Sequence, residues 1–241
     1  MIPKKLTTDE ISKLNQNFKE ADPESILKWA LQNFENSITL ACSFGAEDLA
    51  LLDMLTKLTP SPSVFYLDTG RLHEETYRTI ESCRLKYGVE FTAYFPDTAQ
   101  VEGLLRKKGP RSFYESAENR KECCEIRKVN PLGRALQNMS AWITGLRRDQ
   151  STFRAETNFI EKDDTHAGVI KINPLAFWTI ENVEFYNKKN GVPVNPLHAQ
   201  GYPSIGCEPC TRPVKPGEDP RSGRWWWENE GHRECGLHLR R

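Results

Sequence analysis

Several features are missing from this sequence, and each absence excludes a class of protein. Charge of one sign is not in excess, because 33 Lys and Arg residues stand against 33 Asp and Glu residues. This balance excludes nucleic-acid binding through bulk positive charge and an acidic disordered tail. No uninterrupted apolar run approaches the roughly 20 residues that cross a membrane, and the N-terminal residues MIPKKLTTDE lack the apolar stretch of a signal peptide. We therefore expect a soluble, cytoplasmic protein that binds neither membrane nor nucleic acid.

Internal repeats and low-complexity tracts are also absent, so the chain is neither a solenoid nor a linker. What is present suits a globular core: 241 residues, of which 38% are hydrophobic and 10% aromatic. This length fits one large domain or two small ones.

Apolar periodicity predicts helices that alternate with short strands. Strands are expected at 37–42, 64–68, 89–95, 141–145 and 169–175, and helices at 6–18, 23–34, 49–58, 73–88 and 118–129. Such alternation indicates a fold of the α/β class, a mainly parallel sheet with helices on both faces. After Gly191 the chain becomes rich in Pro, Gly, Arg and Trp. We therefore divide it into an α/β domain at 1–191 and an irregular C-terminal segment at 192–241.

Two loops follow predicted strands at the carboxyl edge of the sheet, where open parallel sheets bind ligands. The loop that contains Ser43, Phe44 and Gly45 opens a helix whose N-terminus could hold an anion. It has neither the Walker pattern nor G-x-G-x-x-G, and taken alone it is better explained as an ordinary strand-to-helix turn. The second loop, Leu67-Asp68-Thr69-Gly70, lies on the same edge and strengthens the case for a nucleotide pocket.

Arginines gather in two further places. Arg147 and Arg148 follow the strand at 141–145, and a guanidinium group suits bidentate contact with phosphate or sulfate. Each could equally be a solvated loop charge. Arg221 and Arg224 precede a run of three tryptophans, which could form a core plug, an interface or, less favoured, a stacking surface for a base.

The seven cysteines do not suit a secreted disulfide framework, since their number is odd. Cys42 and Cys83 lie in apolar surroundings and are most simply small buried hydrophobic residues. Four others form two pairs that could ligate zinc or an iron–sulfur cluster: Cys123, Cys124, Cys207 and Cys210. Adjacent cysteines point in different directions, which favours a cluster, but zinc stays open and a vicinal disulfide is least favoured. Lys121, Arg127 and Lys128 place positive charge beside the first pair.

Cys235 belongs to neither pair and lies near the end of the chain, in Glu234-Cys235-Gly236-Leu237-His238. Neighbouring His and Arg side chains would lower the pKa of its thiol and provide a nucleophilic thiolate near neutral pH. An incidental surface cysteine is an equally good explanation from chemistry alone.

Taken together, SFGAEDLALLD, KECCEIRK, GLRRDQS, the C-x-x-C, RSGRWWWE and ECGLH resemble the assimilatory adenylylsulfate (APS) reductases of the APS/3′-phosphoadenosine 5′-phosphosulfate (PAPS) reductase family. The resemblance covers nearly the whole chain, and the two cysteine pairs are its most discriminating feature.

The resemblance implies an adenine-nucleotide α-hydrolase-like fold and a role for each motif. Cys123, Cys124, Cys207 and Cys210 would hold a 4Fe-4S cluster that does not itself pass electrons to the substrate. The nucleotide would be bound by two loops, one made of Ser43, Phe44 and Gly45 and the other of Leu67, Asp68, Thr69 and Gly70. Lys128, Arg147, Arg148, Arg221 and Arg224 would bind the phosphosulfate. Cys235 would be the nucleophile, with His238 in its motif.

The implied reaction is attack of the Cys235 thiolate on the sulfur of adenosine 5′-phosphosulfate, which yields AMP and a Cys235 S-sulfonate. Thioredoxin, the reductant of this family, then releases sulfite. The alternatives are a reductase that prefers or accepts the 3′-phosphorylated substrate, an ATP-using adenylating or thiolating enzyme of the same fold, and a non-catalytic zinc or redox module. A homo-oligomer is expected.

Overall fold

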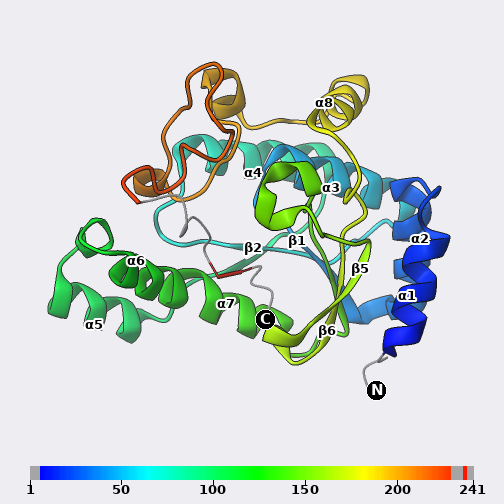
Figure 1. Ribbon diagram of the computed structural model, residues 1–241, viewed down its shortest axis with the longest axis horizontal. Helices are drawn as coiled ribbons and strands as arrows, with labels where there is room; N and C mark the ends of the chain where they lie inside the picture. Colours follow the sequence, from blue (N-terminus) through cyan, green and yellow to red (C-terminus); the bar gives the residue numbers. More distant parts are fainter. Residues whose placement is uncertain (1–5, 229–235, 238–241) are drawn as a thin grey trace.

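The computed structural model describes residues 6–228 and 236–237 of the chain (Figure 1). At its centre is a six-stranded sheet with the strand order β3-β2-β1-β4-β6-β5. The strands are β1 (Ile38–Ala41), β2 (Val64–Leu67), β3 (Thr92–Tyr94), β4 (Ala141–Ile143), β5 (Ile160–Asp163) and β6 (Val169–Ile172). Every neighbouring pair is parallel except β5 with β6, which is antiparallel. The predicted α/β class with a mainly parallel sheet is confirmed.

Local sequence signals mark the ends of some of the helices. They are α1 (Thr8–Asn17), α2 (Pro23–Phe34), α3 (Ala46–Leu58), α4 (Glu74–Tyr87), α5 (Thr98–Lys108), α6 (Ala117–Cys124), a π-helix (Glu125–Val129), α7 (Asn130–Leu136) and α8 (Ile180–Lys189). Asp22 caps α2 by accepting from the Ser25 amide, and Pro23 takes the first helical position. Helix α4 ends at Gly88, whose φ of 64° is a left-handed conformation that favours glycine.

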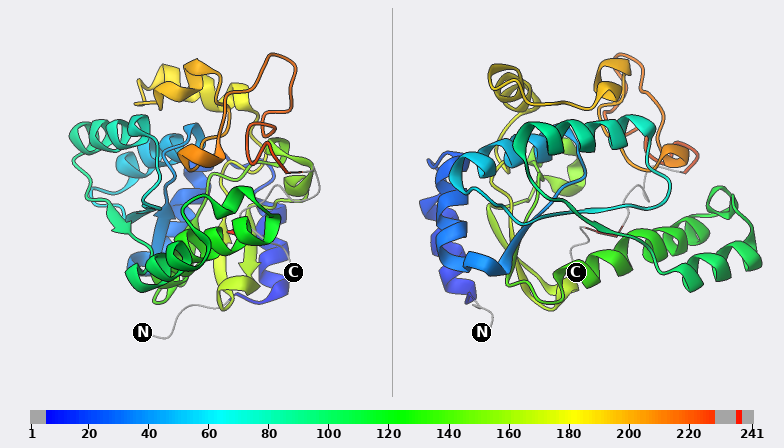
Figure 2. Two further views of the ribbon diagram at one scale, coloured as in Figure 1. Left: turned by 90° about the vertical axis from the view of Figure 1, so that its left-hand side faces the viewer. Right: turned by 180° about the vertical axis from the view of Figure 1, so that it is seen from behind.

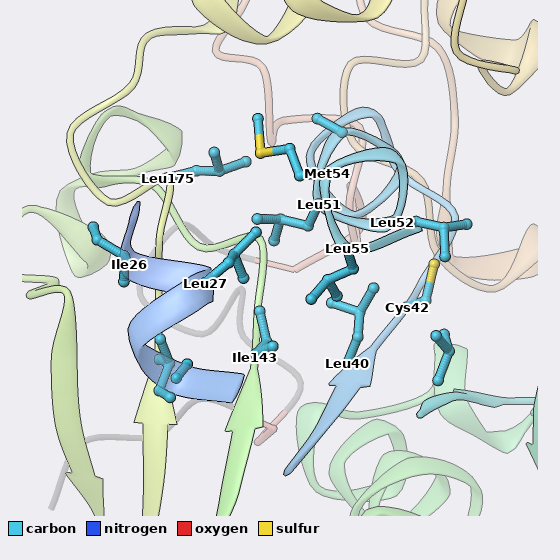
Figure 3. Close-up of a cluster of buried hydrophobic side chains, with 14 of the residues drawn as sticks. Ile26, Leu27, Leu40, Cys42, Leu51, Leu52, Met54, Leu55, Ile143 and Leu175 are labelled. Atoms are coloured by element: carbon cyan, nitrogen blue, oxygen red, sulfur yellow. The ribbon is translucent and has the colours of Figure 1, made fainter. Parts of the chain in front are cut away.

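The layers are those of a sheet covered on both faces (Figures 1 and 2). Helices α2 and α3 pack against β1 on one face, α8 packs on α3, and α7 packs against β2 and β3. Figure 3 shows the main core between the sheet and α3, where Leu51 and Leu55 lie close to Leu40 of β1 and Ile143 of β4. These side chains are at most 1% exposed, and each buried leucine contributes roughly 1.5–3 kcal/mol. The core therefore fixes the strand ends from which the site is built.

The structure departs from the sequence-based prediction in several elements. Helices α5, α7 and α8 and the short strand β5 were not predicted, and β3 spans 92–94 where a strand was expected over 89–95. The helix expected over 118–129 is divided, because α6 ends at Cys124 and a π-helix follows it. Apolar periodicity does not reveal this change, since it reports which side chains are buried and not which carbonyl each amide pairs with.

The segment after Gly191 is irregular, as predicted. In its described part the helices are two short 3-10 turns, Pro196–Gln200 and Glu208–Cys210. It joins a second hydrophobic cluster, made of Leu104, Phe113, Cys123, Cys207, Cys210 and Trp225. The division into a domain at 1–191 and a segment at 192–241 stays a prediction. None of the described helices is long and apolar enough to cross a bilayer.

Candidate functional site

The central strand β1 has β2 on one side and β4 on the other. The strand order therefore reverses direction at β1, and the loops after β1 and β4 lie side by side at the carboxyl edge of the sheet. A single carboxylate joins the loops that follow β1 and β4. Asp48 Oδ2 accepts from the amide and the hydroxyl of Ser43, each at 2.6 Å, and Asp48 Oδ1 accepts from the Gly145 amide at 3.1 Å. A Cβ at Gly145 would lie 2.4 Å from Asp48 Oδ1. Glycine is therefore needed for this close approach.

Asp48 titrates close to neutral pH. Burial raises the pKa of this carboxyl to about 6, although hydrogen bonds from Ser43 and Gly145 act in the opposite direction. The carboxylate form has enough acceptor sites for all three donors, whereas the protonated form has fewer. We therefore expect protonation of Asp48 to weaken its contact with the two loops.

The Ser43-Phe44-Gly45 loop presents its backbone and the exposed Ser43 to the carboxyl edge, and its aromatic side chain turns inward. Phe44 is 1% exposed and makes edge-to-face contacts with Tyr66 and Phe91. Its φ of 59° is unusual for a residue with a side chain. The buried ring holds the loop in this conformation. Gly45 is the N-cap residue of α3.

The loop after β2 connects the carboxyl edge to the cysteines. Asp68 accepts from the Tyr77 hydroxyl at 2.9 Å and from the Gly70 amide at 2.9 Å. The Thr69 carbonyl accepts from Arg127 Nη1 at 2.6 Å, and the Thr69 hydroxyl lies 3.2 Å from Cys207 Sγ. This loop therefore lies between the strand ends and the cysteine pairs.

The two cysteine pairs lie far apart in the sequence and come from separate elements, but they meet at one small cavity. The cavity is lined by Cys123 and Cys124 from α6, Cys207 and Cys210 from the C-terminal segment, and Arg71, Phe113, Arg120, Arg127, Lys128 and Trp225. All four thiols are free and at least nine-tenths buried. Burial opposes ionisation of Cys207, but Lys128, the Thr69 hydroxyl and Arg224 hold the pKa of this thiol below its ordinary value.

The donor set of this cavity fits a thiolate-bound metal group, although among the described residues no three Cys, His, Asp or Glu side chains already converge as ligands of one ion. Arg127 Nε and Trp225 Nε1 are buried N–H donors without a hydrogen-bond partner in the described structure. Four thiols that surround a space, with cations and unpaired donors facing it, fit an anionic iron–sulfur group.

The guanidinium of Arg224 packs closely against the segment 204–206. Its guanidinium donates to the Ser204 hydroxyl and the Ile205 carbonyl, each at 3.3 Å, and lies over the Trp225 ring at 4.7 Å. A Cβ at Gly206 would lie 2.2 Å from Arg224 Nη2. Glycine at 206 therefore makes the space that Arg224 occupies.

Comparison with known proteins decides the family. Residues 37–213 match the model of the phosphoadenosine phosphosulfate reductase domain. The chain belongs to this reductase family.

Relatives in this family are similar over most of their length. An adenosine 5′-phosphosulfate reductase of Burkholderia cepacia is 50% identical over 204 residues, which are 85% of this chain and 81% of the relative. One from Pseudomonas aeruginosa (strain LESB58) is 44% identical over 234 residues, 95% of this chain and 86% of the relative.

Solved structures show the same fold. A phosphoadenylyl-sulfate reductase of Candida auris, in a phosphate complex, has a TM-score of 0.75 and 30% identity, and the match covers 87% of this chain and 99% of that one. An FMN adenylyltransferase of Candida glabrata bound to ATP has a TM-score of 0.57 at 17% identity, over 95% of this chain and 77% of that one. The second likeness shows the fold alone, and the two together agree with the predicted adenine-nucleotide α-hydrolase-like architecture.

Two of the arginines predicted to bind an anion in this reductase are engaged elsewhere. Arg147 donates to Glu47 at 2.9 Å and also pairs with Asp149. Arg148 donates to the Thr157 carbonyl at 2.6 Å and covers the Phe177 ring. Neither side chain is among those that line the described cysteine cavity. Their role as phosphosulfate ligands stays a prediction, as does that of the half-buried Arg221.

Three residues of the cavity were not predicted from the sequence: Arg71, Phe113 and Arg120. Arg71 directly follows the Leu67–Gly70 loop. Arg120 lies four residues before Cys124 in α6, a spacing that places two side chains on one face of a helix. Both signals were present in the sequence, whereas the approach of Phe113 depends on tertiary packing.

Cys42 and Cys83 are buried and free, as predicted, at 1% and 0% exposure. Burial raises the pKa of the Cys83 thiol to about 12 and that of Cys42 well above its ordinary value. Neither is therefore suited to act as a thiolate nucleophile. The predicted nucleophile Cys235 and its neighbour His238 lie outside the described residues.

Proposed function

We propose that this chain reduces adenosine 5′-phosphosulfate to sulfite and AMP through an S-sulfonate on Cys235, as an oxidoreductase of assimilatory sulfate reduction. The observation that carries the proposal is the meeting of two unlike cysteine pairs at one cavity ringed by Arg71, Arg120, Arg127 and Lys128. Relatives at 44–50% identity carry the name adenosine 5′-phosphosulfate reductase.

The four thiols of Cys123, Cys124, Cys207 and Cys210 would hold a 4Fe-4S cluster. When bound, this group would join the C-terminal segment to α6 and fix the surrounding cations in place. The buried N–H donors of Arg127 and Trp225 support the proposal, because they lack partners in the described structure and would donate to its sulfur atoms.

The nucleotide would bind at the carboxyl edge of the sheet, on the α/β domain at 1–191. The backbone of Ser43, Phe44 and Gly45 and the first turn of α3 would hold the phosphate, and Leu67 to Gly70 would lie near the adenosine. Lys128, Arg221 and Arg224 would bind the phosphosulfate, with Arg147 and Arg148 at the loop after β4. These cations are needed because a thiolate must approach a substrate that is itself an anion.

In the first half-reaction the Cys235 thiolate attacks the substrate sulfur. An S–S bond forms, the bond from sulfur to the phosphate oxygen breaks, and AMP leaves with the electron pair. His238 lies three residues away in the same motif and would donate a proton or orient the thiol.

In the second half-reaction a thiolate of a dithiol protein, of the thioredoxin type, attacks Cys235 Sγ. Sulfite leaves with the electron pair, and a mixed disulfide remains. The second thiol of the dithiol protein then attacks the sulfur of the first one in this disulfide. The dithiol protein is left with an internal disulfide, and Cys235 is released as a thiol. The two electrons that reduce the sulfonate therefore come from the dithiol.

Two substrates are compatible with the family, because the Candida auris structure is a phosphoadenylyl-sulfate reductase. The higher identity to adenosine 5′-phosphosulfate reductases favours the substrate without the 3′-phosphate. Steady-state assays with both nucleotides and reduced thioredoxin test this: we expect the larger kcat/KM with adenosine 5′-phosphosulfate. A larger value with the 3′-phosphorylated nucleotide would reverse the assignment, and activity with neither would refute the proposed function.

We further propose that the enzyme works in the cytoplasm, since its thiols must stay reduced to bind iron and to react. A homo-oligomer is expected as well, and light scattering of the purified protein would test it.

A further inference from the structure

Arg71 connects three stretches of chain that enclose the cysteine cavity. It directly follows the Leu67–Gly70 loop, and its backbone carbonyl accepts from the Glu208 amide of the C-x-x-C at 2.8 Å. Its guanidinium donates to the Pro110 carbonyl at 2.9 Å and lies over the Phe113 ring, 4.7 Å from the ring centre. Pro110 and Phe113 belong to the connection between α5 and α6. One residue therefore links the loop after β2, the C-terminal segment and this connection.

Arg71 also lies between the cavity and solvent. It is half-buried, whereas Phe113 beneath it is 3% exposed and belongs to the hydrophobic cluster that contains Cys123, Cys207 and Cys210. Both Arg71 and Phe113 line the cavity. A guanidinium over an aromatic face is a favourable arrangement that holds the two groups together. Arg71 therefore covers an apolar wall of the cavity.

The charge of Arg71 is directed at the thiols and not at a carboxylate. Within the described part of the chain no Asp or Glu side chain forms an ion pair with Arg71, unlike Arg120, which pairs with Glu228. Burial raises the pKa of the Cys123 thiol, and the charge of Arg71 acts in the opposite direction. A half-buried cation without a carboxylate partner suits an anionic group inside the cavity.

We propose that Arg71 is a positioning residue that closes the cysteine cavity against solvent and thereby slows the loss of iron from it. The inference rests on the proposed function, because it requires the four thiols to hold an iron–sulfur group. The stack on Phe113 and the hydrogen bond to Pro110 keep the wall in place. Without them, water and a chelator reach the metal more easily, and the anionic group also loses a neighbouring positive charge.

The test measures how fast iron leaves the loaded enzyme. Wild type, Arg71→Ala and Arg71→Lys are purified anaerobically, reconstituted with iron and sulfide where needed, and mixed with an excess of an iron chelator. The loss of the visible absorbance of the cluster is timed, and Tm and the Kd for AMP are measured on the same samples. Arg111→Ala is the matched control, because the Arg111 guanidinium lies over the neighbouring Tyr114 ring at 5.3 Å but is not among the side chains that line the described cavity.

We expect Arg71→Ala to lose iron about tenfold faster than the wild type, in line with the loss of one stacked cation and one hydrogen bond. Arg71→Lys should fall between the two, since lysine keeps the charge but lacks the planar group that stacks on Phe113. This variant also carries the comparison if Arg71→Ala cannot be loaded with iron. Arg111→Ala should match the wild type, and Tm and the Kd for AMP should be unchanged in all variants.

Equal rates of iron loss in the wild type and both Arg71 variants would overturn the inference. An equal acceleration in Arg111→Ala would do so too, because it would indicate a general weakening of the 110–114 segment. A weaker Kd for AMP with unchanged iron loss would likewise overturn it and would assign Arg71 to the nucleotide. Wild-type enzyme that contains no iron and sulfide, or zinc in their place, would instead refute the proposed cluster, so the two failures are distinguishable.

Discussion

Arg120 and Glu228 form a two-armed ion pair inside the protein, with both N–O distances at 2.8 Å and side-chain exposures of 1% and 5%. Arg120 is also stacked on Trp225, its guanidinium 4.7 Å from the ring, and Arg224 approaches a Trp225 ring at the same distance. The pair joins α6, which carries Cys123 and Cys124, to the last described residue before position 229. One contact thus connects the cysteine pair to the segment that leads toward Cys235.

Glu228→Gln should destabilise the fold by about 3 kcal/mol, because it leaves the buried Arg120 charge without its counter-charge. Chemical denaturation followed by far-UV circular dichroism measures this change. The matched control is Glu81→Gln, which removes a surface pair with Arg84 whose side chains are 54–55% exposed, and it should cost less than about 1 kcal/mol. Equal effects of the two substitutions would show that the buried pair adds little.

Gly206→Ala should displace Arg224, since the added Cβ would lie 2.2 Å from its Nη2 atom. If Arg224 binds the phosphosulfate, kcat/KM should fall by about tenfold or more, which matches the 1.5–3 kcal/mol of a hydrogen bond to a charged group. Arg224→Ala and Lys128→Ala should show losses of the same size. Gly103→Ala is the control, because no atom lies within 4 Å of the Cβ position there. Full activity of Gly206→Ala and Arg224→Ala, with iron retained, would remove Arg224 from the site.

Substrate binding should weaken as the pH falls through about 6, the pKa to which burial raises Asp48. Above this pH the carboxylate accepts from Ser43 and Gly145; below it, a proton occupies one acceptor site and the two loops separate more easily. The KM for adenosine 5′-phosphosulfate, measured from about pH 5 to pH 7.5, should rise on the acid side.

Asp48→Asn should give a higher KM near pH 7 and a profile that is flat across the same window, because the amide does not titrate. If the variant and the wild type had the same acid limb, another group would be responsible and Asp48 would have no part in it.

Each of Cys123→Ser, Cys124→Ser, Cys207→Ser and Cys210→Ser should lose both bound iron and acid-labile sulfide, because the four thiols line one cavity. Cys83→Ala removes a thiol that lies in the main core and should keep the iron. Anaerobic purification with iron, sulfide and zinc analysis checks the set. Stoichiometric zinc without sulfide in the wild-type protein would contradict the iron–sulfur proposal.

The alternation of strands and helices was predictable because burial imposes a period on each element. The Asp22-Pro23 start of α2 and the Gly88 end of α4 are local signals, and the structure shows both. Strand β5 was missed because its sequence, IEKD, has one apolar residue and is stabilised by antiparallel pairing with β6. Such pairing is a tertiary property that composition does not report.

For the candidate site, residue chemistry was predictable and spatial arrangement was not. The four thiols could be grouped because two cysteine pairs supply the four thiolates that zinc or an iron–sulfur cluster needs, and the structure brings them to one cavity. The inward turn of Phe44 and the engagement of Arg147 by Glu47 depend on packing and on partners 100 residues away. A loop arginine looks the same in sequence whether it binds a substrate or an internal carboxylate.

The most direct test of the account is a single incubation of the purified enzyme with adenosine 5′-phosphosulfate and no thiol, followed by peptide mass analysis. We predict one equivalent of AMP and one SO3 group on the peptide that holds Cys235, with thioredoxin then releasing it as sulfite. Cys235→Ser should keep iron and bind nucleotide but form no adduct, since a serine hydroxyl stays protonated near neutral pH. Turnover by Cys235→Ser, or a sulfonate found on Cys42 or Cys83, would contradict the mechanism.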